Sequence, residues 1–158
     1  MNDSVYRCDP EKHLEIYKAN CHYIVETLQF LLESELLVSP ARLCVISSIW
    51  QTVARQEKLS YTMSKAALQG LVLSASIDLA GDGHLINAVL PGALDTPMTR
   101  ENLRPEQISK LLSSTKFNRL PSLHDVTSLV MFLCSTENTG ITGQFVAADL
   151  GFSRVHLL

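Results

Sequence analysis

Short apolar segments alternate along this chain with longer segments in which apolar residues recur at helical spacing. A short apolar run that is bounded by glycine, proline or serine is typical of a strand buried on both faces. Such segments occupy Leu43 to Ile46, about Leu85 to Leu90, and Gln144 to Ala148. Helical spacing covers about 11–37, 60–79, 105–112 and 119–135. Helices placed between strands predict a single α/β domain over 1–158, with about three parallel strands and helices on both faces.

The segment from Leu43 to Ala67 holds the first candidate for chemistry. Its strand stops at Ser48, at the edge of an open α/β sheet where ligands bind. In the helix that follows, Tyr61 and Lys65 are spaced four apart and share one face. A serine that orients a carbonyl oxygen, a tyrosine acid/base and a lysine that lowers the phenol pKa together suit proton transfer beside a hydride exchange. A tyrosine and a lysine one turn apart are also common on solvated helix faces, so this pair alone does not define a site.

Three other features each leave two interpretations open. Asn20 lies within the first predicted helix, where an asparagine is most simply a solvated surface residue. Pro91 and Gly92 end the second predicted strand, and by themselves they indicate an ordinary turn. Trp50 can line a pocket or cover the core, and the pattern favours neither.

Four motifs, in this order, resemble the landmarks of classical short-chain dehydrogenases/reductases. They are YKAN at Tyr17 to Asn20, Ser48 followed by YTMSK with Tyr61 and Lys65, INAVLPGALDTPMT at Ile86 to Thr99, and ITGQFVAADLG at Ile141 to Gly151. The resemblance covers almost the whole chain. It implies a Rossmann-type doubly wound parallel sheet, NAD or NADP as the cofactor, and hydride transfer between a small-molecule alcohol and a carbonyl compound.

The resemblance also implies a role for each candidate residue. Tyr61 is expected to be the acid/base, and Ser48 to orient the carbonyl. Lys65 is expected to lower the pKa of Tyr61 and to hold the nicotinamide ribose. Asn20 is expected to support the proton relay. The cofactor-binding set is expected to close over the nicotinamide half, where a glycine permits close approach to a flat ring. That set comprises Tyr61, Lys65, Pro91, Gly92, Leu94 and Thr96. No metal is expected, because the five histidines show no metal-ligand spacing.

The glycine-rich strand-turn-helix that holds the cofactor pyrophosphate in this family has no counterpart among the seven glycines of this sequence. The chain therefore looks like the carboxyl-terminal part of such an enzyme, with an incomplete sheet whose open edge a second chain could cover. The residue that separates NAD from NADP binding belongs to the part without a counterpart. An alternative function is that of a non-catalytic homologue acting as a dimerisation or regulatory partner.

Composition and spacing narrow the expected partners. Ala66, Gly70 and Ser74 form a ridge of small residues, which allows close helix packing either within the chain or between two copies. In the resembled family, helices equivalent to 11–37 and 60–79 pair into a homodimer. The net charge of −3 and pI near 5.9 argue against a nucleic-acid partner.

The remaining sequence features favour a cytoplasmic protein. No uninterrupted apolar stretch is long enough to span a bilayer. Residues 1–10 are polar, unlike a signal peptide, and are expected to form a loose leader. The four cysteines contain no C-x-x-C pair, which favours reduced, buried or inert thiols.

Overall fold

The sheet has three parallel strands in the order β1, β2, β3 in the computed structural model, which describes residues 2–155. The strands are β1 (Arg42–Ile46), β2 (Leu85–Pro91) and β3 (Phe145–Ala148). Ile46 is paired with Val89, and Val89 in turn with Val146, so the carboxyl ends of all three strands lie at one edge of the sheet. The predicted α/β architecture with three parallel strands is confirmed.

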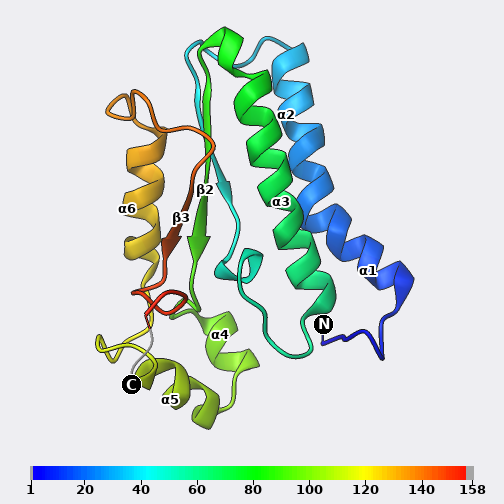
Figure 1. Cartoon of the computed structure of the whole chain (residues 1–158), viewed down its shortest axis with the longest axis vertical. Helices are drawn as coiled ribbons and strands as arrows, with labels where there is room; N and C mark the ends of the chain where they lie inside the picture. The colour runs from blue at the N-terminus through cyan, green and yellow to red at the C-terminus, as the bar shows by residue number, and fades with distance from the viewer. Residues whose placement is uncertain (1, 156–158) are drawn as a thin grey trace.

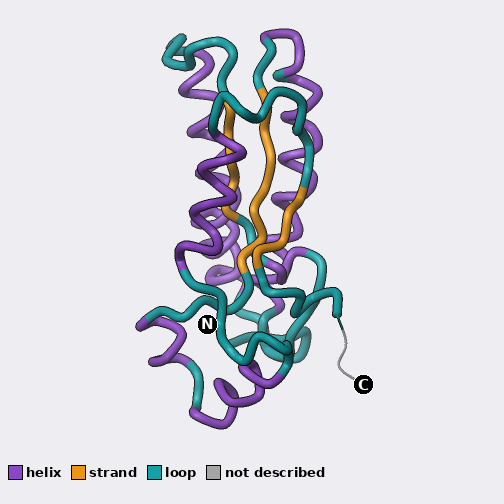
Figure 2. The backbone as a smooth tube through the Cα atoms, turned by 90° about the vertical axis from the view of Figure 1, so that its left-hand side faces the viewer, coloured by secondary structure: helices purple, strands orange, loops and turns teal. Residues whose placement is uncertain are grey.

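Helices cover both faces of this sheet (Figure 1). On one face lies α3 (Leu59–Asp78), and the helical segments α1 (Pro10–Tyr17) and α2 (Tyr23–Glu33) pack against it. On the other face lies α6 (Leu123–Cys134). Two short helices, α4 (Pro97–Asn102) and α5 (Pro105–Ser113), lie beyond the carboxyl ends of the strands, where Figure 2 also shows most of the loops.

The core follows the alternation of the central strand. Ile86, Ala88 and Leu90 point toward α3, where they pack with the fully buried side chains of Leu68 and Val72. The residue between two of them, Val89, faces the opposite way and packs with Val126 and Leu133 of α6. A strand buried on both faces needs apolar residues at successive positions, which explains the unbroken apolar run in the sequence.

The first long helix is interrupted by a π-helical segment, η1 (Lys18–His22), which the sequence pattern does not reveal. The helix begins as the sequence indicates, with Pro10 in its first turn, and Asp9 caps it by accepting from the backbone of Glu11 and Lys12. Asn20 lies in the middle of the π segment. Such wide turns inside α-helices are uncommon and occur often at functional sites.

The same helix ends at Glu33, four residues before the predicted end at residue 37. The backbone N–H of Leu36 donates to Leu31 O at 3.1 Å and that of Glu35 donates to Leu32 O at 3.2 Å, and Glu35 has a φ of 53°. This is a Schellman motif, which usually places glycine at the left-handed position. A glutamate there gives no sequence signal, so the predicted end was wrong.

The expectation of a loose leader was also wrong. Asp3 is only 3% exposed, and its carboxylate accepts from both the backbone N–H and the hydroxyl of Ser60. Backbone hydrogen bonds join Asp3 to Glu57 and Leu59 as well. The amino-terminal segment is therefore docked on the first turn of α3, a contact across 57 residues that local patterns cannot predict.

Candidate active site at the strand ends

Ser48 lies just beyond β1, where it caps a short 3-10 turn by accepting from the backbone of Trp50 at 3.3 Å. It is buried, with 6% of its surface exposed. The preceding residue, Ser47, donates its backbone N–H to Val89 O at 2.9 Å, so the pairing with β2 continues one residue past the strand. Ser48 is therefore held beside the carboxyl end of β2.

Tyr61, in the first turns of α3, faces Ser48. Burial raises the pKa of the Tyr61 phenol, and hydrogen bonding with Ser48 lowers it by a smaller amount. The net pKa is above that of an ordinary tyrosine, so the phenol is protonated at neutral pH and is ready to donate a proton.

Lys65 lies one helical turn after Tyr61, as predicted, with its Nζ 5.9 Å from the centroid of the Tyr61 ring. The ammonium group donates to Ile46 O at 3.1 Å, at the end of β1. Burial lowers the Lys65 pKa, and the Cys21 thiol nearby acts in the opposite direction. Burial of the phenol is the main influence on the Tyr61 pKa, and the expected lowering of that pKa by Lys65 stays a prediction.

Asn20 is connected to α3 through a serine. Its side-chain amide donates to Ser64 Oγ at 3.0 Å, and the Ser64 hydroxyl donates to the backbone carbonyl of Tyr61 at 2.8 Å. The simplest interpretation, a fully solvated asparagine, is therefore wrong. The amide fixes the π segment against the part of α3 that carries Tyr61 and Lys65.

A polar cluster around Ser60 anchors the start of α3. The sequence pattern did not predict this cluster. The Ser60 hydroxyl donates to Asp3, and its oxygen lies 2.8 Å from His13 Nδ1. Since the hydroxyl proton goes to Asp3, the Ser60 oxygen is available to accept from the imidazole. Ser60 is fully buried and directly precedes Tyr61, so this cluster fixes the backbone on which the phenol is carried.

The residues predicted to hold the nicotinamide begin at the end of β2. Gly92 donates its backbone N–H to Ala148 O at 3.1 Å, which extends the pairing with β3. A Cβ on Gly92 would come within 2.9 Å of Asp149 Cβ and 3.4 Å of Pro121 Cγ. The chain itself thus requires glycine here, a packing reason that differs from the predicted close approach to a ring.

Leu94 and Thr96 have structural contacts of their own. Leu94 packs against the cluster of Val89, Val126 and Leu133. Thr96 is the N-cap of α4, accepting from Thr99 N at 3.3 Å. Pro91, the last residue of β2, is buried. The cofactor roles of these residues stay predictions.

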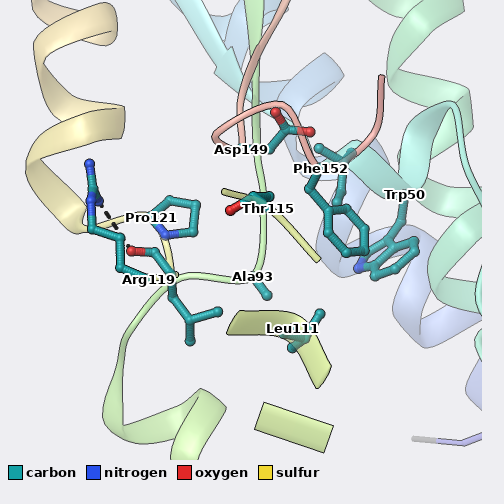
Figure 3. Close-up of a pocket in the computed structure, with 10 residues that line it drawn as sticks. Trp50, Ala93, Leu111, Thr115, Arg119, Pro121, Asp149 and Phe152 are labelled. Carbon is teal, nitrogen blue, oxygen red and sulfur yellow. Dashed lines mark hydrogen bonds between the residues drawn. The ribbon is translucent and has the colours of Figure 1, made fainter. Parts of the chain in front are cut away.

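A small cavity of about 20 Å³ lies next to this region, between the strand ends and the segment around α5. Figure 3 shows Trp50 and Phe152 side by side on one wall, Leu111 of α5 on another, and Thr115 in the middle. Trp50 both lines this cavity and packs against the core, which answers the question the sequence left open. The Thr115 hydroxyl is buried and has no hydrogen-bond partner within residues 2–155.

Asn87 is another important residue that the sequence reading passed over. It is fully buried within β2, donates to Ile141 O at 2.7 Å, and accepts from Gln144 N at 3.0 Å. These bonds tie β2 to the chain that enters β3. A lone amide within the apolar run INAVL was the available signal, because buried amides are almost always hydrogen-bonded.

Metal-ligand clusters and membrane-spanning helices are both absent from the part of the chain that the structure describes. Among residues 2–155, no group of three or more histidine, cysteine, aspartate or glutamate side chains could hold a metal ion. No helix in that range is long and apolar enough to cross a membrane.

Comparison with known proteins gives matches over most of the chain. A family model described as enoyl-(acyl carrier protein) reductase matches residues 1–153. The chain is 32% identical over 111 residues to 2-(R)-hydroxypropyl-CoM dehydrogenase of Xanthobacter autotrophicus, covering 70% of this chain and 44% of the relative. It is 32% identical over 106 residues to a 3-oxoacyl-(acyl-carrier-protein) reductase of Thermotoga maritima, covering 67% and 43%. The chain thus spans less than half the length of these curated relatives.

Solved structures match the fold more completely. The chain is similar to a putative gluconate dehydrogenase from Agrobacterium tumefaciens, with a TM-score of 0.91 at 18% identity over 98% of this chain and 61% of that one. It is also similar to 3-oxoacyl-(acyl-carrier protein) reductase from Brucella melitensis in complex with NAD, with a TM-score of 0.88 at 25% identity over 99% and 64%. The sheet described above is therefore part of a Rossmann-type fold.

Proposed function

The chain belongs to the short-chain dehydrogenase/reductase family, and from this premise we propose that it supplies the catalytic half of an NAD(P)-dependent oxidoreductase. The reaction would interconvert a hydroxyl and a carbonyl group of a small molecule. The observation that carries the proposal is the meeting of Ser48, Tyr61 and Lys65 beyond the carboxyl end of β1. The structure of the Brucella relative was solved with NAD, which supports a nicotinamide cofactor without separating NAD from NADP.

Each residue of the site has a chemical task in this proposal. A bound nicotinamide would supply the hydride for reduction or accept it for oxidation. Tyr61 donates its phenol proton to the carbonyl oxygen during reduction, and Ser48 holds that oxygen by a hydrogen bond. Lys65 is close enough to stabilise the resulting phenolate by charge and to bind the nicotinamide ribose. Asn20 holds the π segment against Ser64, which keeps the start of α3 in position.

The binding test uses two probes, NADH and the reduced nicotinamide mononucleotide that forms one half of it. Because all the proposed contacts lie on the nicotinamide half, we expect saturable binding of both, with dissociation constants within about tenfold of each other. Lys65→Ala is expected to weaken binding by about tenfold or more, since a charge-assisted hydrogen bond is lost. Nicotinamide fluorescence is the measurement.

Lys12→Ala is the matched control, because Lys12 is an exposed lysine on α1. Its binding should equal that of the unmodified chain. A folded chain that binds neither probe would contradict the proposal and favour the alternative, a non-catalytic homologue that acts as a dimerisation or regulatory partner.

We propose further that the chain forms a homodimer through α1, α2 and α3. A groove of about 670 Å³ runs between α2 and α3 and is lined mostly by apolar side chains, including Val25, Leu28 and Leu71. The predicted ridge of Ala66, Gly70 and Ser74 is exposed. That exposure favours packing between copies over packing inside one chain. A second copy is the proposed occupant, because small residues let two helices approach closely.

Gly70→Glu is expected to weaken this dimer by about 100-fold or more, since it buries an unpaired charge in the interface. A Cβ on Gly70 meets nothing within 4 Å, so the monomer fold should tolerate the change. Gly70→Ala is the control, expected to keep the dimer and to stabilise the helix by about 0.5–1 kcal/mol. Sedimentation equilibrium measures the first effect and urea unfolding the second. A purely monomeric unmodified chain would contradict the dimer.

A further inference from the structure

Two cysteines that are far apart in the sequence lie side by side in the fold. Cys44 is in the middle of β1. Cys134 is the last residue of α6, the helix that packs against β1 (Figure 1). Each thiol contributes to the pKa shift of the other, as expected for two neighbouring groups. Leu133, directly before Cys134, is 1% exposed and belongs to the apolar cluster against which Cys44 packs.

The two thiols differ in how easily a reagent can reach them. Cys134 is exposed, whereas Cys44 is half-buried beneath it. Burial raises the pKa of the Cys44 thiol to about 11, and burial also raises that of Cys134. Both are therefore protonated at neutral pH, and the exposed sulfur is the one that an oxidant meets first.

We propose that Cys44 and Cys134 form a disulfide when the protein meets a low-molecular-weight disulfide such as glutathione disulfide. The bond links the end of α6 to β1, the strand that leads to Ser48. This inference is independent of the proposed oxidoreductase activity, because it uses neither the strand-end site nor a cofactor.

The chemistry proceeds by two exchanges. The Cys134 thiol loses its proton, and the thiolate attacks one sulfur of glutathione disulfide, which breaks the S–S bond and releases one glutathione thiolate. The Cys44 thiol then loses its proton and attacks Cys134 Sγ, releasing the second glutathione. Two protein thiols are oxidised with loss of two electrons and two protons, and one glutathione disulfide is reduced to two glutathione molecules.

The four cysteines allow a direct test, because trypsin separates them onto four different peptides. Cleavage after lysine and arginine gives peptides 8–12, 19–42, 43–55 and 120–154, with one cysteine in each. After incubation with glutathione disulfide and blocking of free thiols, mass spectrometry without reductant should find 43–55 joined to 120–154. The yield of this product should rise with pH, because the raised pKa of both thiols limits the thiolate at neutral pH.

Cys8 serves as an internal reporter, since it is exposed and should form a mixed disulfide with glutathione under the same conditions. Cys21→Ser should leave the linked peptide unchanged, whereas Cys134→Ser should abolish it while the circular dichroism spectrum stays the same. If Cys8 is fully modified and the folded chain gives no link between 43–55 and 120–154, the proposal is overturned. A mixed disulfide that persists on Cys134 would overturn it as well, because Cys44 would then be out of reach.

Discussion

Replacing Tyr61 with phenylalanine should lower the rate of NADH or NADPH oxidation by about 10²–10⁴-fold, the usual contribution of a general acid/base. The change removes only the phenol oxygen, so the proton for the carbonyl oxygen loses its donor while the ring keeps its packing. Stability should fall by no more than about 0.5–1.5 kcal/mol, the net value of one hydrogen bond such as that with Ser48. The measurement is steady-state oxidation of the cofactor with a panel of small ketones and aldehydes.

A second readout does not depend on turnover. Because burial raises the Tyr61 pKa, its phenol should ionise at higher pH than an exposed tyrosine. The pKa of Tyr17 is raised as well, mainly by a hydrogen bond with Cys21, so Tyr61→Phe should reduce the late step of the tyrosinate absorbance titration by one tyrosine. Tyr23→Phe is the matched control, since Tyr23 is 53% exposed on α2. It should keep full activity and the late step. Equal turnover in Tyr61→Phe and the unmodified chain would refute the acid/base assignment.

Asn87→Ala should lower the free energy of unfolding by about 2–4 kcal/mol, from the cavity left in β2 and an unpaired backbone group. Ile141 O keeps a donor in Asn138, at 3.1 Å, but Gln144 N loses its acceptor in a partly buried hydrogen bond. For a domain of this size, the midpoint of thermal unfolding should fall by roughly 5–15 °C. Calorimetry or thermal circular dichroism provides the measurement.

Gln29→Ala is the matched control for this loss. Gln29 also carries a side-chain amide, but it is exposed on α2 and donates to the exposed carboxylate of Glu33 at 2.8 Å. Its removal should change stability by less than about 0.5 kcal/mol. If Asn87→Ala and Gln29→Ala have equal effects, the buried amide does not hold β2 to the entry of β3.

The strands were predictable from the sequence because a strand that is buried on both faces requires apolar side chains at successive positions. Ile86, Ala88 and Leu90 must pack under α3 while Val89 packs under α6, so the apolar run is continuous and easily recognised. The meeting of Ser48 with Tyr61 was predictable for a related reason. A parallel strand fixes where its carboxyl end lies, and the helix that follows must return along the sheet.

Other features could not be predicted, because the interactions that decide them span most of the chain or use unusual residues. Asp3 is buried by its bonds to Ser60, but neither residue stands out locally. The early end of α2 depends on Glu35 in a left-handed conformation, where glycine would have given the signal. The raised pKa of Tyr61 follows from burial of its phenol, which the spacing of Tyr61 and Lys65 in the sequence does not reveal.

The π-helical segment has a consequence for the orientation of the two halves of this helix. A wide turn accommodates one extra residue, and in a regular α-helix one residue corresponds to a rotation of about 100°. Tyr17, Cys21, Val25 and Leu32 nevertheless all line the same groove, so the helical faces on the two sides of Lys18–His22 remain aligned. The wide turn thus takes up one residue without rotating the two halves of the helix relative to each other. A one-residue insertion or deletion elsewhere in the helix would turn the residues beyond it away from this groove.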